Sequence, residues 1–176
     1  MKKKILIISA LVLIILIVIH EIFYYTTSNK LIENLQLMNV SSTIIALSTS
    51  KIWSDAINDK VSSVSEKYFE KYEQYGRTRY KYDFNVGIYN FYQDNDTQSI
   101  LTVIDDTATQ CSKYYSMYSY TLFHSKRNKL IEDFYDASLR LKKLAESPSG
   151  NYTTFNNALN EQLDAISVAR EKLHIK

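Results

Sequence analysis

The feature that most constrains this chain is an apolar run near its N-terminus, directly after three consecutive lysines. Lys2 to Lys4 precede a segment from Ile5 to Ile19 in which Ser9 is the one polar residue. As a helix, the range 5–25 is roughly 31 Å long at about 1.5 Å per residue, which matches the hydrocarbon core of a bilayer. We therefore predict a transmembrane helix at 5–25. Its expected membrane contacts are Ile5, Leu6, Leu11, Leu13, Leu16 and Ile19, with Tyr24 and Tyr25 as an aromatic pair at the interface.

The lysines also predict the side of the membrane on which each part of the chain lies. Lysines beside a membrane helix preferentially stay in the cytoplasm, so residues 1–4 should be a cytoplasmic tail and residues 26–176 an extracytoplasmic domain. A cleaved signal peptide has the same charged start and stays open as an alternative. The length of the apolar run and the lack of an Ala-x-Ala site favour an uncleaved signal-anchor. No Cys lies just after the run, which excludes a lipoprotein.

The composition predicts a few long helices after the membrane segment. The chain has three glycines and a single proline. A β-sandwich or barrel needs a turn about every ten residues and normally carries many more of both. The charge balance excludes another class of function. The chain has 21 basic and 19 acidic residues, and three of the basic ones are the N-terminal lysines. The remaining domain is close to neutral, so nucleic-acid binding has no electrostatic basis.

Three long segments repeat apolar residues every three or four positions, which is the spacing of one helix face. The first covers residues 28–75, and Gly76 is expected to end it. The second covers residues 96–144, with Asp96 as its N-cap. The third covers residues 152–173. These segments predict three long helices beyond the membrane.

Residues 77–92 fit two templates. Alternation of apolar and polar residues at Tyr80, Tyr82 and Phe84 is typical of a strand, but a single strand would have no partner. The helical template fits from Asp83 onward, with Asp83 as N-cap, so we predict a short helix at 83–93. The expected fold is all-α: an N-terminal transmembrane helix followed by an antiparallel bundle of three long helices plus one short helix.

Tyrosine is frequent, with 15 residues in the chain. Most should bury their rings at the edge of the core and keep their hydroxyls near the surface. The segment 114–120 contains four of them, which one core cannot accommodate together, so at least one or two should face outward. This segment is the candidate contact surface, formed by Tyr114, Tyr115, Tyr118 and Tyr120.

No grouping of catalytic or metal-ligating residues stands out in the sequence. Cys111 is the only cysteine and lies on an apolar helical face, so a buried free thiol is expected. His20, His124 and His174 are far apart and do not have metal-ligand spacing. Glycine-rich phosphate loops and nucleophile-elbow motifs are also missing. We therefore predict no enzyme activity, no metal and no cofactor.

These observations favour a membrane-anchored protein that works through the surface of its helical domain, as an interaction or structural module at the cell surface. The alternative is a ligand-binding sensory bundle that acts through a partner protein, because a single span provides no second helix leading to a cytoplasmic output. The expected partners are the membrane and either a protein or a cell-wall glycan.

Several short motifs between residues 50 and 160 carry a resemblance. A helix containing Trp53 precedes a short helix that opens in Phe84-Asn85, and a later helix ends in the turn at 144–150. Phe155 and Asn156 follow that turn. In these features the chain resembles small exported or membrane-anchored helical proteins of Gram-positive bacteria, whose function is unknown. The resemblance implies a helical fold and a cell-surface location, and no activity. Many such relatives are lipoproteins, whereas this chain lacks the lipid-acceptor Cys.

Overall fold

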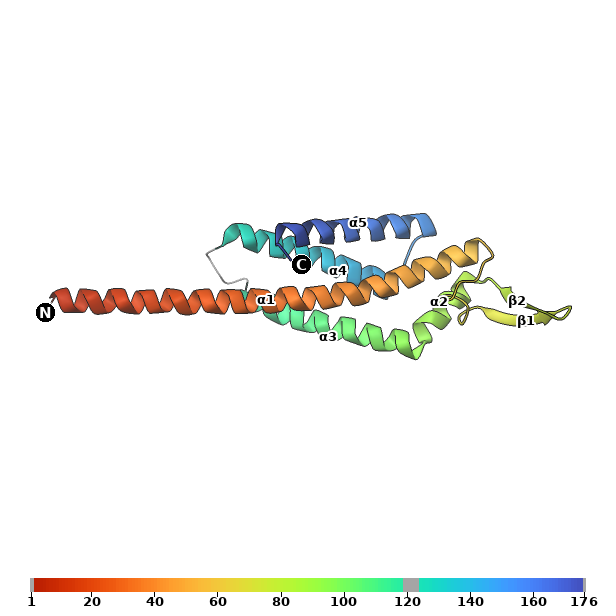
Figure 1. Ribbon diagram of the computed structural model, residues 1–176, viewed down its shortest axis with the longest axis horizontal. Helices are drawn as coiled ribbons and strands as arrows, with labels where there is room; N and C mark the ends of the chain where they lie inside the picture. Colours follow the sequence, from red (N-terminus) through yellow and green to blue (C-terminus); the bar gives the residue numbers. More distant parts are fainter. Residues whose placement is uncertain (1, 119–123, 176) are drawn as a thin grey trace.

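The computed structural model describes the backbone of residues 2–118 and 124–175, and the side chains in these ranges from Ser9 onward. The molecule is elongated and mostly helical, with a two-stranded hairpin at the end opposite the N-terminus (Figure 1). The helical prediction is thus confirmed in outline. In chain order the elements are α1 (Lys2–Ile57), β1 (Glu70–Gln74), β2 (Arg77–Lys81), α2 (Phe84–Gln93), α3 (Asn95–Tyr118), α4 (Ser125–Glu146) and α5 (Tyr152–Lys172).

Helix α1 is one unbroken element of 56 residues. At about 1.5 Å per residue it is roughly 84 Å long. No glycine or proline occurs before Gly76, so no residue in α1 favours a break. The predicted transmembrane segment and the first helix of the domain therefore form a single helix without a linker. The sequence prediction is wrong about the other end of this helix, which lies at Ile57 and not at Tyr75.

The chain leaves α1 through a loop built around the buried carboxylate of Asp55. The hydroxyls of Ser62 and Ser65 both donate hydrogen bonds to Asp55 Oδ2. Lys51 Nζ lies 2.6 Å from Asp55 Oδ1. Burial alone would raise the pKa of Asp55, but these three donors outweigh it and hold the pKa below its ordinary value. Ser62 and Ser65 are poor helix formers, and their hydroxyls bond back to Asp55 and close a turn. The helix ends before this turn, at Ile57.

The hairpin of β1 and β2 is a feature that the sequence prediction missed. Its two strands pair antiparallel from Glu70 with Lys81 to Gln74 with Arg77. Tyr75 and Gly76 form the turn, and both have positive φ (53° and 69°), as a type I′ turn requires. The strand pattern at 77–92 therefore has a partner in β1, a segment that tyrosine spacing had assigned to the first helix.

Helix α2 confirms the short helix predicted at 83–93. The side chain of Asp83 caps it by accepting hydrogen bonds from the backbone N–H groups of Asn85 and Val86. The following residues pack α2 closely against α1. A Cβ atom placed on Gly87 would lie 2.8 Å from Phe69 Cε1 and 3.2 Å from Ile52 Cγ2. Only glycine fits at this contact between α2, α1 and the loop before the hairpin.

The described part of the segment predicted as one helix over 96–144 contains two helices, α3 ending at Tyr118 and α4 beginning at Ser125. His124 directly precedes α4 and has a positive φ of 76°. The N-cap of α3 also differs from the prediction. Asp94 accepts hydrogen bonds from the backbone N–H groups of Asp96 and Thr97, so Asp96 lies in the first turn. The last predicted helix is confirmed as α5, which begins with a capping box at Asn151.

The second half of α1 is the central element of the domain, and α3, α4 and α5 lie along it (Figure 1). Helix α4 runs in the same direction as α1, because Tyr24 bonds Asn128 near one end and Asn39 bonds Ser138 farther along. Helix α5 contacts both α4 and α1. The core includes Leu31, Leu35, Met38, Ile45, Ile52, Ile104, Phe134, Leu141, Phe155 and Leu159.

Candidate functional site

Helix α1 is the one helix in the described part of the chain that is long and apolar enough to cross a membrane. From Ser9 to Ile19 its side chains are exposed around the whole circumference, unlike those of a helix buried in a soluble core. Among the predicted membrane contacts, Leu11, Leu13, Leu16 and Ile19 are exposed, and Tyr25 is also largely exposed. The side chains of Ile5 and Leu6 lie outside the described residues.

Tyr24 differs from its expected role as an interfacial residue, because the structure buries it completely. Its ring stacks on His124 at 4.3 Å, and its hydroxyl donates a 2.8 Å hydrogen bond to Asn128 Oδ1. Glu21 is 3.0 Å from His124 Nε2. The N-terminal end of α4 is thus fastened to α1 immediately after the exposed apolar segment. The helical domain begins at the residues where the membrane segment was predicted to end.

Residues 114–118, the described part of the candidate contact surface, mostly pack within the domain. Tyr118 is buried, and its hydroxyl donates a 2.7 Å hydrogen bond to the carbonyl oxygen of Asn128, so the prediction is wrong for this residue. Tyr115 stacks on Tyr135 of α4 with ring centres 4.3 Å apart. Tyr114 is half-buried against the core. Tyr120 lies outside the described residues.

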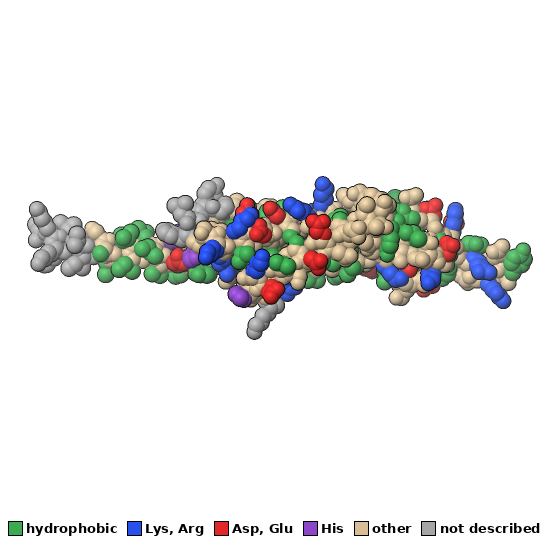
Figure 2. All heavy atoms as spheres, turned by 90° about the horizontal axis from the view of Figure 1, so that it is seen from above, with side chains coloured by type: hydrophobic (Ala, Val, Ile, Leu, Met, Phe, Trp, Pro, Cys, Tyr) green, Lys and Arg blue, Asp and Glu red, His purple; other side chains and the backbone are tan. Residues whose placement is uncertain are grey.

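An exposed aromatic surface occurs instead at the hairpin, which the sequence prediction missed. Tyr75 at its tip is 94% exposed, and Tyr72 on β1 is about half exposed. Arg77 and Arg79 on β2 have no carboxylate within salt-bridge distance in the described ranges. Figure 2 shows basic and apolar side chains gathered at this end of the molecule. Exposed Tyr and Arg together are the composition of binding hot spots.

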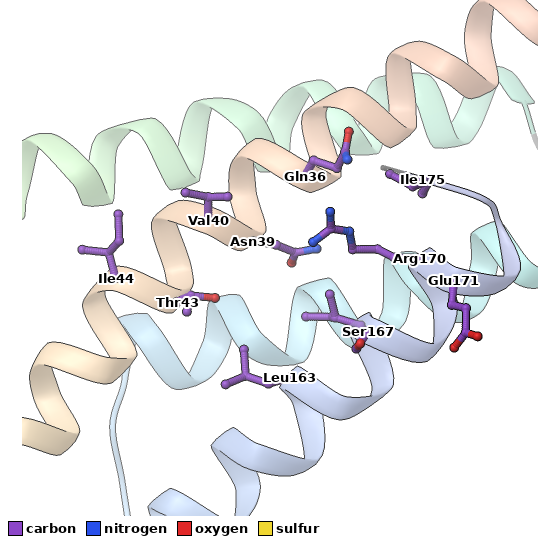
Figure 3. Close-up of a pocket in the computed structure, with 11 residues that line it drawn as sticks. Gln36, Asn39, Val40, Thr43, Ile44, Leu163, Ser167, Arg170, Glu171 and Ile175 are labelled. Carbon is purple, nitrogen blue, oxygen red and sulfur yellow. The ribbon is translucent and has the colours of Figure 1, made fainter.

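A groove between α1 and α5 is the second surface that the sequence does not reveal. Its volume is about 590 Å³, within the range of about 300–1,000 Å³ that is typical of small-ligand sites. Its apolar lining residues include Val40 and Ile44 of α1 and Leu163 of α5 (Figure 3). Toward the C-terminal end of α5, Arg170 extends to Gln36 and Asn39 of α1. The groove is therefore apolar at one end and carries a cation at the other.

Asn39, one of the residues that line this groove, carries a fully buried polar atom without a hydrogen-bond partner. Only 7% of the residue is exposed, and its amide nitrogen donates a 2.9 Å hydrogen bond to Ser138 Oγ. Ser138 Oγ uses its own hydrogen on the carbonyl oxygen of Phe134, so Asn39 must be the donor and its Oδ1 faces elsewhere. That Oδ1 accepts no hydrogen bond in the described part of the structure. A buried acceptor without a donor costs about 1–3 kcal/mol.

Cys111 and His174 lie apart from the other candidate catalytic residues, whereas His20 and His124, which are far apart in the sequence, both lie within 4 Å of the Glu21 carboxylate (3.9 and 3.0 Å). Cys111 is buried in the core, and desolvation raises its pKa to about 12, so its thiol stays protonated. His20 and His124 lie near the base of the domain and His174 after α5. Over the described ranges, no three His, Cys, Asp or Glu side chains are grouped to hold a metal ion.

No protein-family model matches the sequence, and comparisons with curated proteins and with solved structures also find no match. The resemblance to exported helical proteins therefore stays a prediction.

Proposed function

We propose that this protein is a single-pass membrane protein whose helical domain acts as an interaction module outside the cytoplasm. Residues 5–25 would cross the membrane with residues 1–4 in the cytoplasm, and residues 26–176 would form an extracytoplasmic antiparallel bundle. The partner of the domain would be another protein or a cell-wall glycan.

The observation that carries this proposal is the continuity of α1. The helix leads without a break from the exposed apolar segment into the packed domain, and its last residue lies close to the hairpin. From Glu21 to Ile57 the helix extends for roughly 55 Å at about 1.5 Å per residue. The exposed Tyr75 and the two arginines of β2 would thus be presented far from the bilayer, where a partner can reach them.

The topology is tested by labelling introduced cysteines in intact cells. Tyr75→Cys should react with a membrane-impermeant maleimide in intact cells, whereas Lys3→Cys should react only after permeabilisation. The native Cys111 is buried and serves as an internal control that stays unlabelled. Equal labelling of both variants in intact cells, or release of the whole protein into the medium, would contradict the proposal.

The interaction function is tested by placing a photo-crosslinking amino acid at Tyr75. A specific adduct is expected from this position, and none from the same amino acid at Glu161, which lies exposed on α5. If neither position gives an adduct and the purified protein turns over a substrate, the protein is an enzyme and the proposal is wrong.

A second candidate function, ligand binding in a sensory bundle, is favoured by the groove between α1 and α5. The groove combines the cation of Arg170 with the apolar residues Val40, Ile44 and Leu163 in its lining. With one membrane segment, such a protein would transmit its signal through a partner protein.

A further inference from the structure

The part of α1 inside the domain carries an apolar stripe that the other described elements leave exposed. From Lys30 to Lys51, the exposed residues of α1 follow each other at intervals of three and four positions. Four consecutive members of this series are apolar and about half exposed: Leu37, Val40, Ile44 and Leu47. We call these four residues the α1 stripe. Large apolar side chains gathered on a surface mark a site of interaction.

The spacing of the α1 stripe is that of a coiled-coil seam. Steps of three, four and three residues place Leu37 and Ile44 at positions a of two heptads, and Val40 and Leu47 at positions d. Figure 3 shows Val40 and Ile44 on neighbouring turns of α1. The positions beside the stripe carry short polar side chains: Ser41, Thr43, Ser48 and Ser50. They leave room for a second backbone at the distance of about 8–10 Å that packed helices keep. The occupant that fits this surface is therefore one α-helix.

The membrane segment selects a second copy of this chain as the source of that helix. With residues 5–25 in the bilayer as proposed, two copies have the same direction and the same depth, because α1 is continuous from the bilayer into the domain. The stripe of one copy then lies at the height of the stripe of the other, which is the arrangement of a parallel, in-register coiled coil. Anchoring in one membrane also raises the effective concentration of the two stripes, so a short seam suffices.

The charges at both ends of the stripe fit the same arrangement. Lys30 and Glu33 are exposed and occupy the a and d positions of the preceding heptad. In a parallel pair, these adjacent layers place Lys30 of one copy beside Glu33 of the other, twice by symmetry. At the opposite end, Lys51 occupies the next a position and is paired within its own copy, with its Nζ 2.6 Å from Asp55 Oδ1. The seam is therefore bounded by complementary charges at one end and by an ion pair within each copy at the other.

We propose that this protein forms a parallel dimer in which the α1 stripe packs against the same stripe of a second copy. Ile44 at position a and Leu47 at position d are the residue types that favour two strands. Helices α3, α4 and α5 pack on the other sides of α1, so each copy offers one face and the assembly closes at two copies. The dimer rests on the proposed function in one respect, because it is the membrane segment that aligns the two copies.

The test is disulfide crosslinking of the full-length protein in membranes. Leu37→Cys and Leu47→Cys should each give a product of twice the mass of the chain when an oxidant is added, because equal positions meet across a parallel seam. In an antiparallel pair these two positions would lie far from their own counterparts, so crosslinking at both defines the direction. Lys143→Cys is exposed on α4, which bonds the buried side of α1, and should give no such product. The wild-type chain, with its buried Cys111, should also give none.

Two matched lysine variants separate pairing at the stripe from chance collision. Ile44→Lys, added to Leu47→Cys, places two like charges in one layer of the seam and should lower the crosslinked fraction at least about tenfold. Val168→Lys, added to the same cysteine variant, should leave the fraction unchanged, because Val168 lies on α5 outside the stripe. The two sites are equally accessible, with Ile44 48% and Val168 47% exposed. Circular dichroism should therefore show the same helix content in both variants.

Three outcomes would overturn the dimer. The first is no crosslink at either Leu37→Cys or Leu47→Cys, which would leave Val40 and Ile44 to a ligand in the groove. The second is an equal loss of crosslinking with Ile44→Lys and Val168→Lys. The third is a product of a mass other than twice that of the chain, which would assign the stripe to a different protein.

Cysteine labelling at Tyr75 and Lys3 reports the topology alone. The expected labelling without crosslinking would overturn the dimer and leave the membrane anchor standing. The opposite labelling would overturn the proposed function whatever the crosslinking shows, so the two failures are distinguishable.

Discussion

Tyr24 and Tyr75 are the same residue type at opposite ends of the domain, in opposite environments. Tyr24, at the base, is fully buried, bonded to Asn128 and stacked on His124. Tyr75, at the hairpin tip, is 94% exposed. The base is held by contacts between segments about a hundred residues apart in the chain. The hairpin is held by strand pairing between neighbours, and Tyr75 at its tip stays exposed. Buried packing is thus concentrated at the base, and exposed side chains at the end that we propose for recognition.

The largest expected effect comes from breaking the base. Tyr24→Ala should destabilise the domain by about 3–5 kcal/mol, because it leaves a cavity among buried rings and removes a hydrogen bond. The matched change Tyr75→Ala should stay within about 0.5 kcal/mol. Chemical denaturation in detergent, followed by circular dichroism, measures both. A similar loss in the two variants would show that the ends do not differ as described.

A smaller effect is expected where α2 joins the domain. Gly87→Ala forces a Cβ toward Phe69 and Ile52 and should cost about 1–3 kcal/mol through overpacking. Gly76→Ala meets no atom within 4 Å, and its cost should be limited to about 1 kcal/mol of backbone strain at positive φ. The same denaturation experiment should rank Gly87→Ala as the more harmful change, and the reverse order would contradict the packing at α2.

The loop around Asp55, where the chain leaves α1, should make the free energy of unfolding depend on pH. The folded pKa of Asp55 is below its unfolded value, so its contribution is fully present above the unfolded pKa of about 4 and is lost as pH falls through the folded pKa. Asp55→Asn should cost about 1–2 kcal/mol at neutral pH and remove part of the acid sensitivity below about pH 4. Parallel acid titrations followed by circular dichroism check this, and identical acid profiles would contradict the role of Asp55.

What the sequence predicted correctly depended on local patterns. The apolar segment, α2 with its Asp83 cap and α5 were found because spacing and caps act within a few residues. The hairpin was missed because β1 is exposed throughout and lacks an alternating apolar pattern, and because Tyr68, Tyr72 and Tyr75 happen to have helical spacing. The break between α3 and α4 was missed because His124 adopts positive φ without a glycine or proline to mark it.

The candidate sites were less accessible to prediction than the fold. Tyr118 is buried because Tyr24 and Asn128 pack against it, and no pattern within 114–120 contains that information. The groove needs Asn39 and Arg170 to meet across two helices, which only the tertiary packing of α1 and α5 provides. Local periodicity identifies the helices, whereas their surfaces depend on which neighbours cover them.

The continuity of α1 has a mechanical consequence. With its apolar part in a bilayer as proposed, the helix is a lever whose pivot is the membrane and whose outer arm measures roughly 55 Å. Each degree of tilt would move the end at Ile57 sideways by about 1 Å, and membrane helices commonly tilt by about 20°. A change in bilayer thickness would therefore displace the hairpin by several ångströms without any rearrangement inside the domain.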